Sequence, residues 1–247
     1  MALLKVLLLL GLGVSANSGV SLQKRIIGGQ NCQDTERLYH VRLESSNATH
    51  SHLCGGSLIH SQWILTAAHC WESEPGWTNV VMLKVHPRTV IHYNQVIRDV
   101  PVIYGPNHNM MLLKLQTPVT DVPLPRLPDC NSRLKIDDVV QLAGEGATTT
   151  GYRRKRLKYP AIPSHLQCVD MNVVSLSHFH LTYGHVFEAK VPNKDICYGD
   201  VGGAVVHNDM IYGVISFVQY KSACRKPTAI MDVCKYLEWI KQTTGLE

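Results

Sequence analysis

Two short stretches of this sequence contain residue types that could take part in a chemical reaction. The first, Trp63–Cys70, ends in His69-Cys70, and histidine can accept and donate a proton near neutral pH. The second, Asp195–Ala204, carries two carboxylates and three glycines around Val201. Valine has two methyl groups on its β-carbon and no oxygen, so it cannot attack a carbonyl or hold an acyl intermediate. The chemistry of the second stretch therefore depends on its backbone and its carboxylates.

The second stretch resembles the Gly-Asp-Ser-Gly-Gly-Pro active-site segment of the trypsin-like serine proteases. It differs at two positions, with Val201 in place of the serine and Ala204 in place of the proline. The positions that match are Gly199, Asp200, Gly202 and Gly203. The family's Cys-Gly-Gly-Ser-Leu-Ile motif is matched at Cys54–Ile59, and its catalytic-histidine segment at Trp63–Cys70. The chain is thus identified as a member of this family over residues 26–247.

The resemblance assigns the three catalytic positions to His69, Asn109 and Val201. In the family a serine attacks, a histidine takes its proton, and an aspartate orients the histidine. Asparagine is neutral, and its NH₂ can donate to the ring and favour the wrong tautomer. Loss of the aspartate alone costs about 10⁴-fold in turnover. We expect no substitute nucleophile at Ser57, which belongs to a strand motif that the family does not use chemically, and we interpret His69 as a packed polar residue.

Other parts of the family's machinery are predicted to persist. The backbone N–H groups of Gly199 and Val201 can form an oxyanion-binding nest, because backbone donors need no particular side chain. Asp200 is the residue that in the family receives the new α-amino group after activation cleavage, and Ile26 is its expected partner. An alternative role for Asp200, compatible with this one, is simply to hold its loop in place.

The resemblance also defines a specificity pocket. Asp195 takes the place of the acidic floor that gives trypsin its preference for Lys and Arg. The glycines that line the trypsin pocket are replaced by Val218 and Thr228, which are β-branched. We therefore expect the pocket to be narrowed or closed, with protein donors around Asp195.

The N-terminal region has the pattern of a secreted precursor. Residues 1–16 combine Lys5, an apolar run and small residues, as a signal peptide does, and residues 17–25 form an expected propeptide ending in Lys24-Arg25. Cleavage after Arg25 would lower the formal charge from +5 to +2, because it removes three positive and no negative side chains. The predicted protease-like domain spans residues 26–247. We expect an extracellular, monomeric protein with no membrane span, no nucleic-acid partner and no cofactor.

Eight cysteines in a secreted chain indicate four disulfides, and the sequence alone leaves many pairings open. The resemblance implies one set: Cys32–Cys168, Cys54–Cys70, Cys130–Cys234 and Cys197–Cys224.

The fold class is predicted from many short apolar or alternating runs separated by turn residues, a pattern typical of a β-sandwich or β-barrel. Among the expected strands are 38–43, 56–59, 63–67, 80–85, 96–103, 110–115, 139–143, 204–206, 211–217 and 228–231. Near-helical apolar spacing from Val233 to Ile240 predicts a C-terminal helix. The resemblance implies an all-β protein with two six-stranded antiparallel β-barrels packed together, at about 26–120 and 121–247. The Pro-rich segment 118–128 is the expected crossover.

Three features suggest binding roles. The basic run, Tyr152–Lys158, is interpreted as a solvated face, a heparin-like polyanion site or a dibasic processing site; its cations are Arg153, Arg154, Lys155, Arg156 and Lys158. Asn47-Ala48-Thr49 is a glycosylation sequon. Alternating histidines occur at His50 and His52 and at His178 and His180, but no cysteine or carboxylate completes a metal set in sequence, so we expect no metal.

The sequence favours a secreted trypsin-fold protease homologue without the nucleophilic serine and triad aspartate, which works by binding a protein or a polyanion. The alternative is an active trypsin-like serine endopeptidase. The two hypotheses differ in one observable, which is whether the processed chain can form a covalent acyl or phosphonyl adduct.

Overall fold

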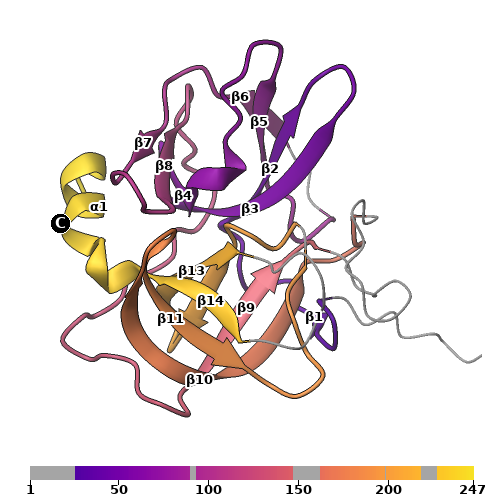
Figure 1. Cartoon of the computed structure of the whole chain (residues 1–247). Coiled ribbons are helices and arrows are strands. Elements are labelled where there is room, and N and C mark those ends of the chain that lie inside the picture. The colour runs from indigo at the N-terminus through magenta and orange to yellow at the C-terminus, as the bar shows by residue number, and fades with distance from the viewer. Residues whose placement is uncertain (1–25, 90–92, 147–161, 198, 218–226) are drawn as a thin grey trace, which may run out of the picture.

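The computed structural model describes residues 26–89, 93–146, 162–197, 199–217 and 227–247. These residues form two antiparallel β-sheets and a short C-terminal helix, as Figure 1 shows. The predicted all-β, trypsin-like fold class is confirmed. Within the described residues, no helix is long and apolar enough to cross a membrane.

The N-terminal sheet has seven strands in the order β6-β5-β2-β3-β4-β8-β7. Their bounds are β2 His40–Ser46, β3 Ser51–His60, β4 Trp63–Ala67, β5 Thr78–Leu83, β6 Tyr93–Val96, β7 Val102–Ile103 and β8 Met110–Lys114. Strand β8, which lies between β4 and the edge strand β7, reads Met-Met-Leu-Leu-Lys, and its four apolar residues are all buried. The sheet counts seven strands rather than the expected six, and the pairings among the described residues do not close it into a ring.

The C-terminal sheet closes on itself. Its order is β1-β10-β11-β14-β13-β12-β9, and β10 also pairs with β9, so six strands form a barrel to which β1 is added at one side. The bounds are β1 Gln30–Asn31, β9 Val139–Gly144, β10 Gln167–His180, β11 Gly184–Lys190, β12 Ala204–His207, β13 Met210–Phe217 and β14 Thr228–Asp232. A 3-10 turn, Val233–Lys235, leads into helix α1, Leu237–Thr244. The helix prediction is confirmed in its main part.

The expected set of strands differs from the structure in two respects. The run 96–103 is not one strand, because β6 ends at Val96 and β7 begins only at Val102. Arg98, Asp99 and Pro101 lie between them, and proline cannot donate a hydrogen bond to a strand partner. Strands β10 and β11 were absent from the expected set, because polar residues and histidines interrupt their apolar pattern.

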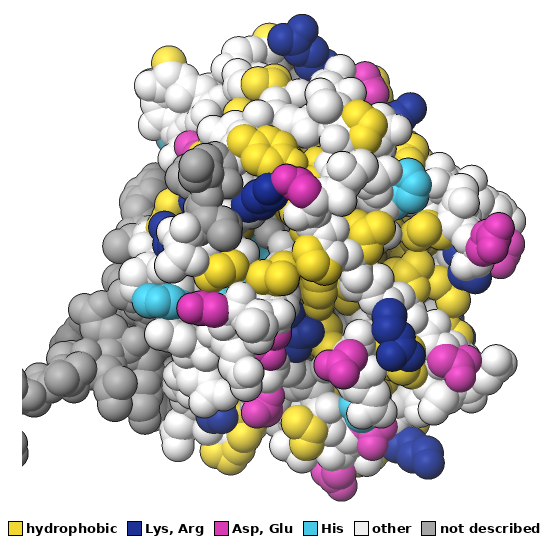
Figure 2. Space-filling model, turned by 180° about the vertical axis from the view of Figure 1, so that it is seen from behind, with side chains coloured by type: hydrophobic (Ala, Val, Ile, Leu, Met, Phe, Trp, Pro, Cys, Tyr) yellow, Lys and Arg dark blue, Asp and Glu magenta, His cyan; other side chains and the backbone are white. Residues whose placement is uncertain are grey.

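The two sheets are joined by residues 115–138, which include the Pro-rich segment 118–128. Among the described residues, the larger of two hydrophobic clusters runs through both sheets and contains Leu58 and Leu112 from the N-terminal sheet with Val205 and Ile230 from the other. Figure 2 shows one face of the molecule, on which acidic and basic side chains are interspersed rather than gathered by sign.

Three of the four expected disulfides are present: Cys32–Cys168, Cys54–Cys70 and Cys130–Cys234. The first joins segments 136 residues apart and the third segments 104 apart, so both constrain long stretches of the unfolded chain. The fourth pairing stays a prediction, because Cys224 lies outside the described residues.

Candidate active site

The residues at the three predicted catalytic positions come from both sheets. His69 lies in the 3-10 turn Ala68–Cys70 that follows β4, and Asn109 immediately precedes β8. Strands β4 and β8 pair through Ala67 and Met110, which brings the two ends together. Val201 precedes β12 in the other sheet, where its carbonyl accepts a 2.7 Å hydrogen bond from the Gly55 N–H of β3.

The Val201 turn is built against the N-terminal sheet. The sulfur of Cys70, the residue after His69, lies 3.9 Å from the Val201 carbonyl oxygen. Gly202 has φ 83°, and a β-carbon there would come within 2.3 Å of the Gly55 carbonyl oxygen. Only glycine fits this close approach. The hydrocarbon side chain of Val201 itself is 5% exposed, and nothing in its chemistry can act as a nucleophile.

The side chain of Asn109 is held by backbone groups on both sides. Its Oδ1 accepts from the His69 N–H at 3.0 Å, while its Nδ2 donates to the Ser216 carbonyl at 3.0 Å. These two contacts fix the orientation of the amide, because a flipped amide would place oxygen against oxygen and N–H against N–H. Asn109 is therefore a well-anchored, buried residue, 5% exposed.

The His69 ring faces both atoms of that amide. Its Nδ1 lies 2.8 Å from Asn109 Nδ2 and 3.0 Å from Oδ1, so Nδ1 can accept from one or donate to the other. A carboxylate would offer only acceptors and would place the proton on Nδ1. Burial lowers the pKa of His69 below its ordinary value, against an opposing contribution from the Asn109 hydrogen bond. The environment thus favours a neutral ring over an imidazolium.

The backbone at the expected oxyanion nest forms a turn at Gly199 and Asp200. Gly199 has φ 96°, and the Asp200 N–H donates to the Cys197 carbonyl at 3.1 Å. Within the part of the chain that the structure describes, neither Gly199 N–H nor Val201 N–H donates a hydrogen bond. The nest stays a prediction, in which these two N–H groups, on either side of Asp200, would donate to an anionic oxygen.

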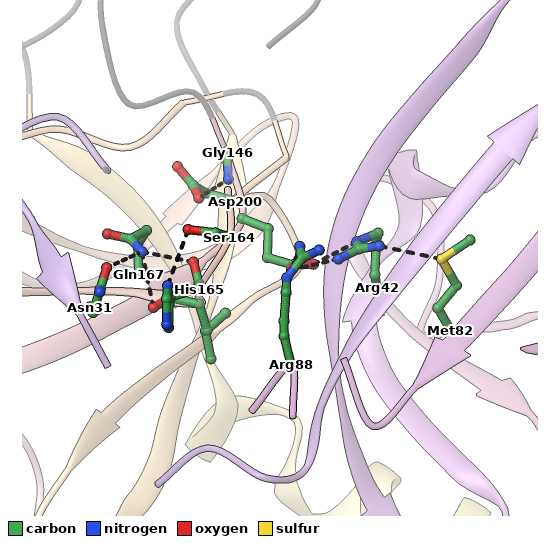
Figure 3. A network of polar contacts seen from close by, with 11 residues as sticks. Asn31, Arg42, Met82, Arg88, Gly146, Ser164, His165, Gln167 and Asp200 are labelled. Carbon is green, nitrogen blue, oxygen red and sulfur yellow. Dashed lines mark hydrogen bonds and ion pairs between the residues drawn. The ribbon is translucent and has the colours of Figure 1, made fainter. Parts of the chain in front are cut away.

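The region around the predicted activation pair is fully buried. Asp200 accepts from the Gly146 N–H at 2.7 Å and from the Cys197 N–H at 2.6 Å, and both Asp200 and Ile26 are 0% exposed. Figure 3 shows the carboxylate of Asp200 directed at Gly146. The next residue, Ile27, forms an isolated bridge with Asp195. The segment that begins at Ile26 is thus packed inside the C-terminal half.

The floor of the expected specificity pocket is buried. Asp195 is 3% exposed, and its Oδ1 accepts from the Ile196 N–H at 2.8 Å. Thr228, the first residue of β14, is 5% exposed, with its Oγ1 3.9 Å from the Met171 sulfur. Val218 lies outside the described residues. The narrowing of this pocket therefore stays a prediction, supported by the burial of both Asp195 and Thr228.

The remaining predicted residues fall in two places. Asn47 lies between β2 and β3, where its Oδ1 accepts from the backbone N–H groups of Thr49 and His50, and this turn is exposed. Ser57 is buried on β3, 2% exposed. The basic run 152–158 lies outside the described residues. Among the described residues, one group of three side chains has the spacing of metal ligands: Cys32, Glu36 and Cys168. Its two cysteines are joined in a disulfide, so the group offers no thiolate.

Sequence reasoning missed a buried ionic cluster that joins the two sheets. Arg42 of β2 donates two 2.6 Å hydrogen bonds to the two carboxylate oxygens of Glu145, and Arg88 adds a third at 3.0 Å. Figure 3 shows the guanidinium groups of Arg42 and Arg88 close to each other, as expected for two groups that bind one carboxylate. Burial by itself would raise the pKa of Glu145, but the Arg42 hydrogen bonds and the nearby positive charges hold it below its ordinary value. The sequence feature that could have indicated this cluster is the position of Glu145, an acid between two glycines directly after an apolar strand.

His40 borders the same cluster. It is 2% exposed, and its Nε2 has no hydrogen-bond partner among the described residues. Burial lowers the pKa of His40 to about 4, with a smaller opposing effect of Glu145. His40 is therefore neutral at neutral pH.

Comparison with known proteins places this architecture in a family. The family model described as Trypsin matches residues 26–240. The chain is 33% identical to trypsin from Sus scrofa over 237 residues, covering 89% of this chain and 95% of the pig protein. It is 33% identical to cationic trypsin-3 from Rattus norvegicus, with 90% of each chain covered, and 30% identical to serine protease 1 from Homo sapiens, with 89% of each covered. The chain belongs to the trypsin family of serine endopeptidases.

Proposed function

We propose that this chain is a secreted, catalytically inactive member of the trypsin family that acts by binding. The observation that supports the proposal is Val201, a hydrocarbon side chain at the position where the family carries its nucleophilic oxygen. Asn109 at the aspartate position and the neutral environment of His69 point the same way. Acyl transfer needs a nucleophile first, so this one position decides the chemistry.

The decisive experiment is covalent labelling. The full chain is cleaved after Arg25, then treated with a fluorophosphonate probe that reacts with activated serine, with active trypsin as positive control. We expect no label on this protein and full label on trypsin. Labelling that depends on His69 and disappears in a His69→Ala variant would overturn the proposal.

The rival function, an active serine endopeptidase, is favoured by a different set of observations. Asp200 and Ile26 are each fully buried, and the Gly199 and Val201 N–H groups donate no hydrogen bond within the described residues, which leaves them available for an oxyanion. A family member can retain the buried activation pair and the backbone N–H groups even when it has no nucleophile. Peptidase activity would require another side chain to attack, and Ser57 is buried within β3.

The proposal includes the secretion and proteolytic processing of the chain. Residues 1–16 would direct secretion and be removed, residues 17–25 would form a propeptide, and the mature chain would begin at Ile26. N-terminal sequencing of the protein collected from the medium of expressing cells tests this directly. A mature N-terminus at Ile26 is the expected result, and retention of residues 1–16 would contradict it.

The same secreted material tests whether Asn47 carries a glycan. Treatment with a glycosidase would remove the glycan and lower the mass of the protein.

For the partner, we propose a protein or a heparin-like polyanion bound through the basic run. Arginine is suited to this role because its planar guanidinium makes paired hydrogen bonds to sulfate. Heparin retention should fall when Arg153, Arg154 and Arg156 are changed together to Ala. Changing Lys84, Lys114 and Lys241 to Ala removes the same charge elsewhere and serves as the matched control. Equal elution of the two triple variants would eliminate this site.

A further inference from the structure

A cavity of about 330 Å³ lies in the C-terminal half and shares no residue with the catalytic positions. Its walls come from β10, β11, β13 and the end of β14, from the 3-10 turn after β14, and from the connection before β9. The residues that line it are Arg133, Leu134, Val173, Leu176, Ser177, Phe187, Tyr212, Asp232 and Lys235. The volume is at the lower end of the range for small-molecule sites.

One part of the lining is hydrocarbon. Three of the lining side chains are at most 3% exposed: Val173, Phe187 and Tyr212. Leu176, by contrast, is 48% exposed and lies near the opening. The Tyr212 hydroxyl donates away from the cavity, to the Ser132 carbonyl at 2.9 Å or the Asp129 carbonyl at 3.2 Å. The tyrosine thus contributes its ring rather than a polar atom. This part of the cavity suits an apolar body.

The other part carries a net positive charge. Arg133 is paired with Asp232, whose second oxygen accepts from the Cys234 N–H at 3.1 Å. Lys235 is exposed and makes no ion pair among the described residues. Two cations and one carboxylate leave one positive charge at the cavity, which matches a single negative charge on a ligand.

A polar atom in the wall also lacks a partner. Ser177 lines the cavity, and its Oγ is shielded from solvent without a hydrogen bond to any described residue. A buried hydroxyl without a partner is unfavourable, and rotation about its χ1 bond would let it donate to a ligand oxygen.

We propose that this cavity binds a small aliphatic monocarboxylate, with its hydrocarbon chain against Phe187 and its carboxylate between Lys235 and Ser177. Charge complementarity, the apolar wall and the unpartnered hydroxyl all point to this chemistry. The binding is independent of the catalytic positions, so it stands whether or not the chain has peptidase activity.

The test uses octanoate and 1-octanol as probes with the full chain in isothermal titration calorimetry. Octanoate should bind at least tenfold more tightly than octanol, because only the acid carries the charge that Lys235 recognises. Equal binding of the two probes, or binding of neither, would overturn the proposal.

Variants locate the site. Lys235→Met keeps the hydrocarbon stem and should weaken octanoate binding about tenfold, whereas Lys241→Met removes a charge from neighbouring helix α1, outside the cavity, and should leave it unchanged. Leu176→Trp should abolish binding by filling the cavity, and Ser177→Ala should weaken it a few-fold. Leu176 and Lys235 are exposed, so these variants should fold, which near-ultraviolet circular dichroism can verify. Equal affinities for the two lysine variants would place octanoate elsewhere and refute the assignment.

Discussion

Val201 and Asp200 are neighbours in the chain, yet they differ in what the fold asks of them. Asp200 accepts two short hydrogen bonds from buried N–H groups, at 2.7 and 2.6 Å. The Val201 side chain has no hydrogen bond to make, and only its backbone carbonyl joins the two sheets. In this chain, therefore, the turn is held by the buried carboxylate of Asp200, whereas position 201 accommodates a hydrocarbon side chain within the same fold.

The largest effect should come from breaking the buried ionic cluster. Glu145→Gln removes the charge that two arginines share and should lower the free energy of unfolding by about 3–5 kcal/mol. Urea denaturation measures the change. The matched control is Asp121→Asn, which breaks the exposed pair with Lys84 and should have no measurable effect. Similar stabilities for the two variants would show that burial does not distinguish the pairs.

The direct test of the comparison changes the two neighbours in turn. Asp200→Ala leaves the Gly146 and Cys197 N–H groups without an acceptor and should destabilise the fold by about 4 kcal/mol. Val201→Ala removes two methyl groups and should cost only about 1.5 kcal/mol. Thermal unfolding of both variants side by side gives the difference. If Val201→Ala proved the more damaging change, the assigned division of roles would be wrong.

The next effect is a pH dependence from His40. Its pKa of about 4 in the folded state lies below the ordinary value of 6.5, so between those pH values the unfolded chain binds more protons. Stability should therefore fall as pH decreases from 6.5 to 4, by roughly 3 kcal/mol in total. Glu145, whose pKa is held below its ordinary value of 4.5, adds a further loss only below that pH. The free energy of unfolding, plotted against pH from 4 to 6.5, should have a steeper slope for the wild type than for His40→Gln. Parallel plots would show that His40 does not cause the pH dependence.

The smallest expected effect is the return of peptidase activity. The double change Val201→Ser with Asn109→Asp restores the family's side chains, but Val218 and Thr228 still replace the glycines that line the trypsin pocket. Turnover of a peptide substrate with Arg before the scissile bond should therefore stay close to background. A third change, Thr228→Gly, provides the comparison, because it opens one wall. Rapid cleavage by the double variant would show that the pocket was open from the start.

The sequence predicted the fold class and the three described disulfides, because long motifs resembled a known family. It did not predict β10 and β11, in which Asp170, Asn172 and several histidines obscure the apolar alternation. The run 96–103 was read as one strand because apolar residues at its ends outweighed the turn residues between them. Local pattern is a weak guide where strands are partly exposed.

What the sequence determined by itself is the identity of the side chains: a hydrocarbon at position 201 and an amide at position 109 are fixed before any folding. Only the tertiary structure decided how these groups meet. Arg42 and Glu145 are 103 residues apart, and nothing in their local sequence marks them as partners. The same holds for the cavity around Lys235, which four strands and two connecting segments build together. Chemistry is a property of single residues, whereas burial, pairing and pKa arise from segments that only folding brings into contact.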